Sequence, residues 1–182
     1  MRVRRVVTGY DKEGKSVFVS DEEVDPVTVD LSPGSEFHLL WGADRAPHFP
    51  DDGSRPEAKA YFPPLGGFRF GFFTVPPDGS VSMPEGLDLA AALSEMEEKL
   101  PGLAGHMEPE APGMHTTATI DFEVILQGEV TLELDDGATR TMGVGDTVVQ
   151  NGTRHRWSNR GDVPAVLAVV LIGAENDRVP PH

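Results

Sequence analysis

The chain has 182 residues, of which 38% are hydrophobic, and we expect a single domain with one buried core. Its 30 acidic and 15 basic residues give a formal net charge of −15, which repels a phosphate backbone and argues against nucleic acid as a partner. The lack of cysteine excludes disulfides and thiolate catalysis. No apolar run is long enough to span a membrane, and the basic start lacks the apolar region of a signal peptide, so a cytoplasmic protein without a membrane partner is expected.

The N-terminal strands are expected within residues 1–42. Residues 3–19 are largely apolar and β-branched, and a Gly-containing turn at residues 11–14 interrupts them, which indicates a hairpin. A further strand is predicted over residues 36–41. We interpret His38, in this strand, as a packed or surface residue rather than a ligand.

Residues 43–64 predict a long irregular loop, because they are dense in Pro, Asp and Gly and show no apolar period. Such a loop either carries function or covers one end of a barrel. The aromatic strand that follows, residues 67–75, places Phe68, Phe70 and Phe72 on one face. We predict that this face lies in the core, in preference to a platform on which a substrate stacks.

A helix is predicted inside residues 80–113. Apolar residues recur at helical spacing from Leu89 to Leu100, Asp88 is suited to be the N-cap, and a Pro-Gly pair stops the pattern. The helix either packs against the outside of the sheet, which we favour, or forms with the loop after it a lid over a site or an arm that reaches a partner subunit.

Short strands and tight turns are expected in the C-terminal part of the chain. Residues 129–142 indicate a hairpin, and residues 165–172 form a continuous apolar run that is typical of a strand buried on both faces. The tail from Gly173 is predicted to be poorly ordered, so that His182 has no expected role. Many short strands, one helix and frequent Gly and Pro turns together predict an all-β sandwich or barrel.

The strand-like segment that starts at His115 has an unusual polar face. In an extended chain one face is polar and the other apolar: His115, Thr117, Thr119, Asp121 and Glu123 against Ala118, Ile120, Phe122, Val124 and Leu126. A second segment places His155, Trp157 and Asn159 on one face. If the polar faces lie inside the fold, two imidazoles and a carboxylate converge, whereas outside they only decorate the surface. We favour the inward orientation.

These residues resemble the two motifs of the cupin superfamily. In the first motif, Gly-x5-His-x-His-x3/4-Glu-x6-Gly, the His, His, Glu and last Gly positions are occupied here by His115, Thr117, Asp121 and Gly128. Residues 145–159 are similar to the second motif, Gly-x5-Pro-x-Gly-x2-His-x3-Asn, with His155 and Asn159 at the family's separation. The match is degenerate, because a threonine stands at the second histidine position and an aspartate at the glutamate position.

The resemblance implies an all-β cupin jelly-roll fold, a double-stranded β-helix barrel with one inserted α-helix. All of residues 1–182 would form a single cupin domain. Its core barrel would span about residues 67–172, with N-terminal strands in residues 1–42 and a helix-containing insertion at residues 80–113. Cupins commonly pair through their N-terminal strands, so the resemblance also implies a homodimer.

The resemblance further implies a metal site. Two histidines and one carboxylate, His115, His155 and Asp121, match the ligand set that binds divalent iron and leaves positions open for substrate or oxygen. Fe(II) is the metal expected, and Mn, Ni or Zn would use the same atoms. Glu123 lies on the same face and either replaces Asp121 as a ligand or acts as a general base, so Glu123 and His155 are the expected catalytic residues.

Three kinds of function remain open. The first, which we favour, is a metal-dependent enzyme, a dioxygenase or a lyase of the dehydratase type, acting on a small hydroxylated or acidic organic molecule. The second is metal-free acid–base catalysis of the isomerase or epimerase type, in which a histidine pairs with a carboxylate. The third is a cupin that binds a small molecule without converting it.

Overall fold

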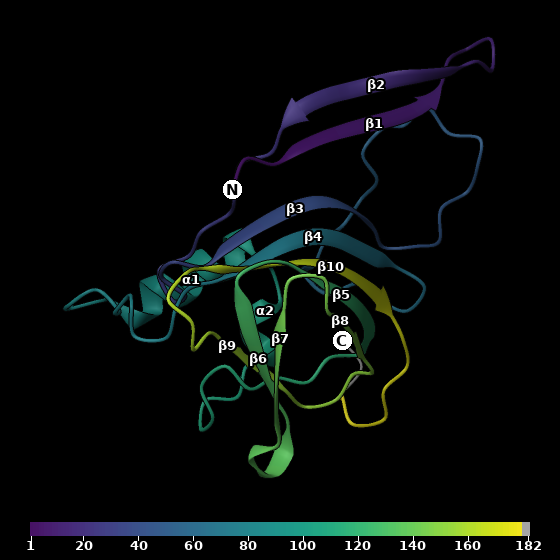
Figure 1. Ribbon diagram of the computed structural model, residues 1–182. Helices are drawn as coiled ribbons and strands as arrows, with labels where there is room; N and C mark the ends of the chain where they lie inside the picture. Colours follow the sequence, from purple (N-terminus) through teal and green to yellow (C-terminus); the bar gives the residue numbers. More distant parts are fainter. Residues whose placement is uncertain (180–182) are drawn as a thin grey trace.

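The structure is a computed structural model that describes residues 1–179 (Figure 1). His182, which has no expected role, lies outside the described residues. Along the chain the elements are β1 (Arg4–Tyr10), β2 (Ser16–Glu23), β3 (Glu36–Ala43), β4 (Phe68–Val75), α1 (Leu89–Lys99), α2 (Leu103–His106), β5 (Thr119–Gln127), β6 (Glu129–Glu133), the 3₁₀ turn η1 (Asp135–Gly137), β7 (Thr139–Gly143), β8 (Thr147–Gln150), β9 (Arg156–Ser158) and β10 (Ala165–Gly173). Strands dominate, which confirms the predicted all-β class.

Three sheets contain these strands. β1 and β2 form a two-stranded sheet, a five-stranded sheet has the order β3-β4-β10-β5-β8, and a three-stranded sheet has the order β7-β6-β9. Figure 1 shows the three-stranded sheet below the five-stranded sheet, so that the two layers enclose an interior. This is the arrangement expected of a jelly roll, in which one face of each strand points inward.

β10 is the central strand of the five-stranded sheet and pairs antiparallel with β4 on one side and with β5 on the other. Near its start, Ala165 and Val166, which lie on opposite faces, are 0% and 3% exposed, whereas Ile172 near its end is 38% exposed. The strand predicted over residues 165–172 is therefore confirmed. Burial on both faces holds only for its first part, because the outer face of the sheet is open where Ile172 lies.

The apolar outer face of the five-stranded sheet corrects one prediction. Phe70 on β4 and Phe122 on β5 are 38% and 44% exposed. The prediction that the face containing Phe70 lies in the core is therefore wrong. The alternation of β4 instead turns Phe73 inward, where its ring stacks on that of Phe37 with 5.0 Å between the centroids.

Two apolar clusters hold the layers together. The first is built mainly from β3 and the two helices and contains Val29, Phe37, Met96, Leu100 and Leu103. The second joins the two sheets and contains Val75, Ile125, Val130, Ala165 and Leu167. Burial of these side chains supplies the main driving force for folding.

α1 begins as the sequence predicts. The Asp88 carboxylate accepts hydrogen bonds from two backbone N–H groups of the first turn, at 3.0 and 3.1 Å. Ala92 and Met96 are 3% and 7% exposed and pack toward the core, whereas Leu89 is 60% exposed. The helix therefore packs on the fold, as favoured. The second helix, α2, was not predicted, and it begins the loop that enters the interior.

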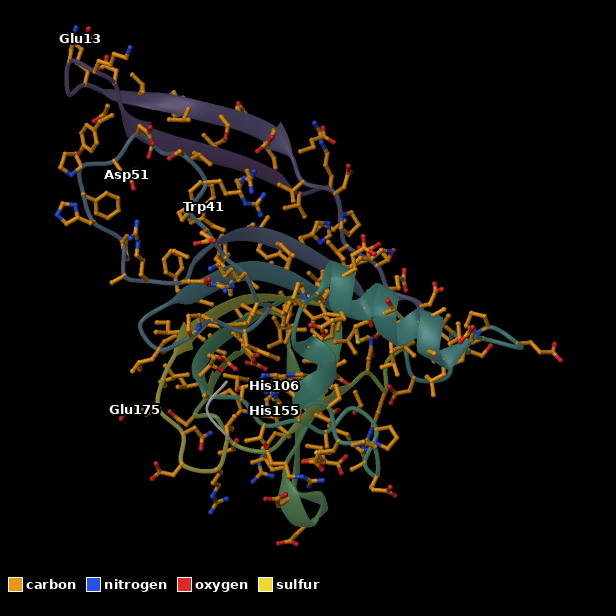
Figure 2. All side chains as sticks on the ribbon, turned by 180° about the vertical axis from the view of Figure 1, so that it is seen from behind. Glu13, Trp41, Asp51, His106, His155 and Glu175 are labelled. Atoms are coloured by element: carbon orange, nitrogen blue, oxygen red, sulfur yellow. The ribbon has the colours of Figure 1, made fainter. Side chains whose placement is uncertain are left out.

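The predicted N-terminal hairpin, β1 and β2, stands apart from the five-stranded sheet (Figure 1). The Arg5 guanidinium donates to the carbonyl oxygen of Leu40 at 2.6 Å and lies over the Trp41 ring, 5.5 Å from its centroid. Near the tip, the Tyr10 N–H donates to the carbonyl oxygen of Asp51 at 2.9 Å, in the long loop (Figure 2). The hairpin is thus anchored at both ends and open between them.

The segment after β10 is tied to the body of the fold. The Asn176 side-chain amide donates to the carbonyl oxygens of Thr117 and Gly152, at 2.8 and 3.1 Å. The Ala174 N–H donates to a carbonyl oxygen of the same segment as Thr117, at 2.8 Å. The prediction of a poorly ordered tail from Gly173 is therefore wrong as far as Asn176, because side-chain and backbone hydrogen bonds fix this stretch.

The predicted domain boundaries, a core barrel at about residues 67–172 and an insertion at residues 80–113, stay predictions. Both helices fall inside the second range. Within residues 1–179, none of the helices combines the length and the apolar character that a membrane crossing requires.

Candidate functional site

His115 and His155 face each other across a backbone bridge. Each donates its backbone N–H to the carbonyl oxygen of the other, at 2.9 and 3.0 Å. Residues that lie directly opposite in this way present their side chains on the same side, and the two ring centroids are 4.2 Å apart. The structure therefore brings together the two histidines that the motifs pair.

Both imidazoles are held in the neutral form. Nδ1 of His115 lies 3.0 Å from the carbonyl oxygen of Gly113, and Nδ1 of His155 lies 2.8 Å from that of Thr153. Since a carbonyl oxygen only accepts hydrogen bonds, Nδ1 carries the proton and Nε2 keeps a lone pair. Burial lowers the pKa of His155 to about 3, with the neighbouring His115 acting in the same direction, and burial also lowers the pKa of His115.

Residues outside the predicted set complete this end of the interior. The Phe62 ring centroid lies 4.6 Å from that of His106 and 6.4 Å from that of His115. Trp157, as expected, contacts His155, with 6.0 Å between the rings. Figure 2 shows His106 and His155 below the five-stranded sheet, near α2. No motif marks Phe62 or His106, because one comes from the long loop and the other from the unpredicted helix.

Asp121 and Glu123 form a buried acid pair on one face of β5. They are 3% and 5% exposed, and Oδ1 of Asp121 and Oε2 of Glu123 have no hydrogen-bond partner within residues 1–179. Burial raises the pKa of Asp121 to about 6. Burial, followed by the charge of Asp121, raises the pKa of Glu123 to about 8. At neutral pH Asp121 is therefore mostly ionised and Glu123 mostly protonated.

Two further polar side chains face the acid pair. Gln150 on β8 is directly opposite Asp121 in the strand register, and its Nε2 is buried without a partner in the described part of the chain. The hydroxyl of Tyr61 has a pKa above its ordinary value, first because of burial and then because of the charges of Asp121 and Glu123. Since Tyr61 belongs to the long loop, this loop brings a functional group to the interior.

A pocket of about 210 Å³ adjoins the acid pair. Its wall includes Tyr61, Val169 and Leu171. On β10, Val169 and Leu171 are the residues directly opposite Glu123 and Asp121. Neither histidine of the bridged pair belongs to the wall. Asp121 and Glu123 are not wall residues either, but Tyr61, Val169 and Leu171 place the inner end of the pocket beside them.

The polar face of the segment that starts at His115 points inward, as favoured. Thr117 and Thr119 are 1% and 3% exposed, and their hydroxyl oxygens are 2.8 Å apart. These threonines lie between the imidazoles and the acid pair along the chain. Within residues 1–179, neither imidazole of the bridged pair hydrogen-bonds to Asp121 or Glu123. The interior thus contains a pair of bases and a pair of acids, with no hydrogen bond between the two pairs in the described residues.

The predicted metal ligands do not form a ligand set. In the part of the chain that the structure describes, no group of three or more His, Asp or Glu side chains is placed to hold a metal ion. His115 and His155 are close to each other, but within residues 1–179 no such group joins Asp121 to both of them. The residues present therefore do not fit the expected site for Fe(II), Mn, Ni or Zn, which needs the carboxylate beside both imidazoles.

Asn159, at the end of the second motif, has a structural role. Its Nδ2 donates to the carbonyl oxygens of Val75 and Val163, at 3.0 and 2.8 Å, and its Oδ1 accepts from the Gly161 N–H at 2.9 Å. The residue is 0% exposed. These bonds use the side chain fully, so Asn159 fixes the turns beside β9 and does not reach the interior groups.

Comparison with known proteins shows which protein family these residues match. A family model described as "Cupin domain" matches residues 105–171, which contain the imidazole pair and the acid pair. A cupin 2 conserved barrel domain protein from Salinispora arenicola is similar in structure, with 20% sequence identity, a TM-score of 0.40, and coverage of 84% of this chain and 90% of that chain.

Curated fungal proteins are similar over most of the chain. Phomopsin biosynthesis cluster protein C' from Diaporthe leptostromiformis is 31% identical over 157 residues, which cover 86% of this chain and 70% of that protein. A cupin-domain-containing oxidoreductase from Neurospora crassa is 25% identical over 174 residues, which cover 92% of this chain and 72% of that protein. Likeness to such oxidoreductases supports an enzyme-like role, without indicating a metal or a reaction.

Proposed function

This chain belongs to the cupin superfamily. From the arrangement of its interior side chains, we propose that it is an enzyme that transfers protons without a metal ion. The substrate is a small hydroxylated carbonyl compound, and the reaction is an isomerisation. The acid pair carries this proposal: Asp121 and Glu123 are buried on one face of one strand, each with an unpartnered oxygen, beside a pocket. Burying such groups costs stability, so a pair of them is typical of a site that acts on a ligand.

The two acids have complementary roles. Asp121, with a pKa of about 6, is the base that takes a proton from the carbon next to the carbonyl group. Glu123, with a pKa of about 8, is the acid that donates its proton to the carbonyl oxygen. The C–H bond breaks and an enediol forms. Return of a proton to the neighbouring carbon, and loss of one from the other oxygen, gives the isomer without any oxidant.

Solvent deuterium exchange tests this function. The protein is incubated in D₂O with hydroxyacetone or 2-hydroxyacetophenone, both neutral hydroxy-ketones, and loss of the C–H signal is followed by proton NMR. We expect exchange by the wild type and a rate lower by about 10²- to 10⁴-fold in Asp121→Asn and Glu123→Gln. Glu98→Gln, an exposed glutamate of α1, is the matched control and should keep the full rate.

Two results would contradict the proposal. One is the lack of exchange with every hydroxy-ketone tried. The other is an unchanged rate in both acid-pair variants, provided that circular dichroism reports an intact fold. The predicted catalytic role of His155 stays a prediction, and His155→Gln in the same assay reports on it.

The metal-dependent dioxygenase or lyase remains the competing hypothesis, and metal analysis separates the two. The protein is reconstituted in turn with iron, manganese, nickel and zinc, dialysed, and analysed beside His155→Ala. We expect exchange activity that neither a chelator nor added metal changes. Bound metal that His155→Ala removes, together with activity that requires it, would favour the competing hypothesis.

We also propose that two copies form a dimer through the N-terminal hairpin. A cleft of about 1120 Å³ lies between the hairpin and the outer face of the large sheet, and apolar residues of both line it, among them Val6, Trp41 and Phe70. On β2, Phe18 is 79% exposed. An isolated two-stranded hairpin is marginal in water. Because one chain supplies both an apolar arm and an apolar cleft, the contact can be reciprocal between two copies.

A further inference from the structure

The pocket beside the acid pair lies where two rows of residues cross the five-stranded sheet. One row, on β3, β4, β10 and β5, consists of Leu39, Gly71, Val169 and Glu123. The next row consists of Gly42, Arg69, Leu171 and Asp121. Each row begins at the edge strand β3 and reaches one member of the acid pair on β5.

Gly71, in the first row, allows the backbone of β3 to lie close to β4. A Cβ atom on Gly71 would lie 2.6 Å from the carbonyl oxygen of His38, so no larger residue fits there without a shift of the backbone. Gly71 therefore adds no side chain to the wall between Leu39 and Val169, and the pocket includes all three residues. A small molecule can therefore lie along the row, with its inner end toward Glu123.

The walls of the inner part are apolar. Phe73, Leu100, Val169 and Leu171 line the pocket, and Tyr61 adds an aromatic ring close to the acids. The volume of about 210 Å³ exceeds the roughly 150 Å³ of an engineered cavity that accepts benzene. The pocket as a whole thus suits a flat body of about the size of a substituted benzene, and its apolar inner part suits the ring.

The wall also contains four basic residues, which is unusual in a chain with a net charge of −15. Three of them pair with carboxylates: Arg69 with Asp44 at 2.6 Å, Lys99 with Glu95 at 2.5 Å, and Lys59 with Glu57 at 3.4 Å. Arg55 has no carboxylate partner within residues 1–179, and its guanidinium makes only a long contact of 3.4 Å to the carbonyl oxygen of Leu39. Arg55 and Lys59 are exposed, so they mark the outer end of the pocket.

We propose that the substrate is a small aromatic or similarly flat ketone that carries a carboxylate, with its ketone group at the inner end of the pocket, beside Asp121 and Glu123, and its carboxylate at Arg55. The orientation follows from charge. A carboxylate at the inner end would meet the acid pair, whereas at the outer end it meets an arginine, whose planar group binds carboxylates through two hydrogen bonds. Lys59 adds a second positive charge there. This inference names the substrate class of the proposed isomerase and rests on that function.

Binding of two matched probes tests the inference. 4-Acetylbenzoate and its neutral analogue 4-acetylbenzamide have the same body and differ in charge, and their dissociation constants are measured by calorimetry at low salt. We expect the acid to bind about tenfold more tightly than the amide to the wild type. Arg55→Gln should remove this preference and Lys59→Gln should reduce it. Arg45→Gln, an exposed arginine of the same loop outside the pocket wall, is the matched control and should keep it.

Equal affinity for the two probes, no binding of either, or a preference that Arg55→Gln leaves intact would overturn the inference. The assay needs no turnover, and the deuterium exchange test uses neutral ketones, so the two proposals fail separately. Exchange without a preference for the acid overturns only the substrate class. A preference that depends on Arg55, without exchange, supports the ligand class and overturns the isomerase.

Discussion

On β5, Asp121 and Glu123 are 3% and 5% exposed, whereas Phe122 and Val124, their neighbours on the opposite face, are 44% and 37% exposed. A sheet with one face in water ordinarily buries its apolar face and solvates its polar one. Here the distribution is reversed along this stretch of the strand. We propose that the inner face carries the chemistry and the outer face contacts another surface, and burying acids and exposing apolar side chains both cost stability that the two apolar clusters must supply.

Two consecutive residues of β5 test most directly whether its two faces differ in burial. Ile125 is 1% exposed and belongs to the second apolar cluster, whereas Leu126 is 40% exposed on the outer face. We expect Ile125→Asp to lower the free energy of unfolding by more than about 4 kcal/mol, because it buries an unpaired charge, and Leu126→Asp to change it by less than about 1 kcal/mol. Urea denaturation measures both, and similar losses would show that the faces are assigned wrongly.

The acid pair makes stability depend on pH. The folded protein keeps the Glu123 proton up to a pKa of about 8, whereas the unfolded chain loses it near 4.5. Between these values the folded state binds more protons, so stability falls as pH rises. Burial lowers the pKa of His38, His115 and His155, which acts in the opposite direction, but only below their unfolded value of 6.5.

The contribution of Glu123 is therefore isolated between pH 6.5 and 8. We expect the wild type to lose roughly 2 kcal/mol over this interval and Glu123→Gln to lose little, because the amide has no proton to release. Denaturant titrations at several pH values measure the difference. A wild type that is equally stable at both ends of the interval would contradict the raised pKa.

The smallest effect on folding is expected at the proposed dimer contact, on the outer face of the large sheet and on the hairpin. Phe70→Lys and Phe18→Lys should change the free energy of unfolding by less than about 1 kcal/mol, since both side chains are exposed, at 38% and 79%. Each should nevertheless convert the dimer to a monomer. Light scattering measures the mass, and Val144→Lys, 67% exposed and outside the cleft, is the control that should stay dimeric. A monomeric wild type would disprove the dimer.

Much of the fold can be predicted from short stretches of the sequence. Asp88 is a good N-cap because its carboxylate can accept from the first turn, and it does so. The hairpin of residues 129–142 follows from alternation around an Asp-Asp-Gly turn. Alternation cannot say which face is inside, since Phe70 and Phe73 are equally apolar. Only the packing of Phe73 on Phe37 decides, and that contact joins two different strands.

The site can be predicted from the sequence only in part. The motifs predicted that His115 and His155 come together, because their spacing encodes the bridge between two strands. The separation of Asp121 from the imidazoles was not predictable, since it depends on how the backbone turns after Thr117. Tyr61 was not predicted as a site residue, because the sequence of an irregular loop does not indicate which of its residues reach the interior.

The bonds made by Asn176 give the end of the described chain a part in the site. Its amide joins the carbonyl oxygens of Thr117 and Gly152, which lie in the two different motifs. Removal of everything after Gly173 would leave each residue discussed as a base, an acid or a ligand in the chain, and would still remove the amide that joins the two segments that carry the imidazoles. A truncation after Gly173 therefore removes a link between the two motifs, although none of the deleted residues is itself a base or an acid of the site.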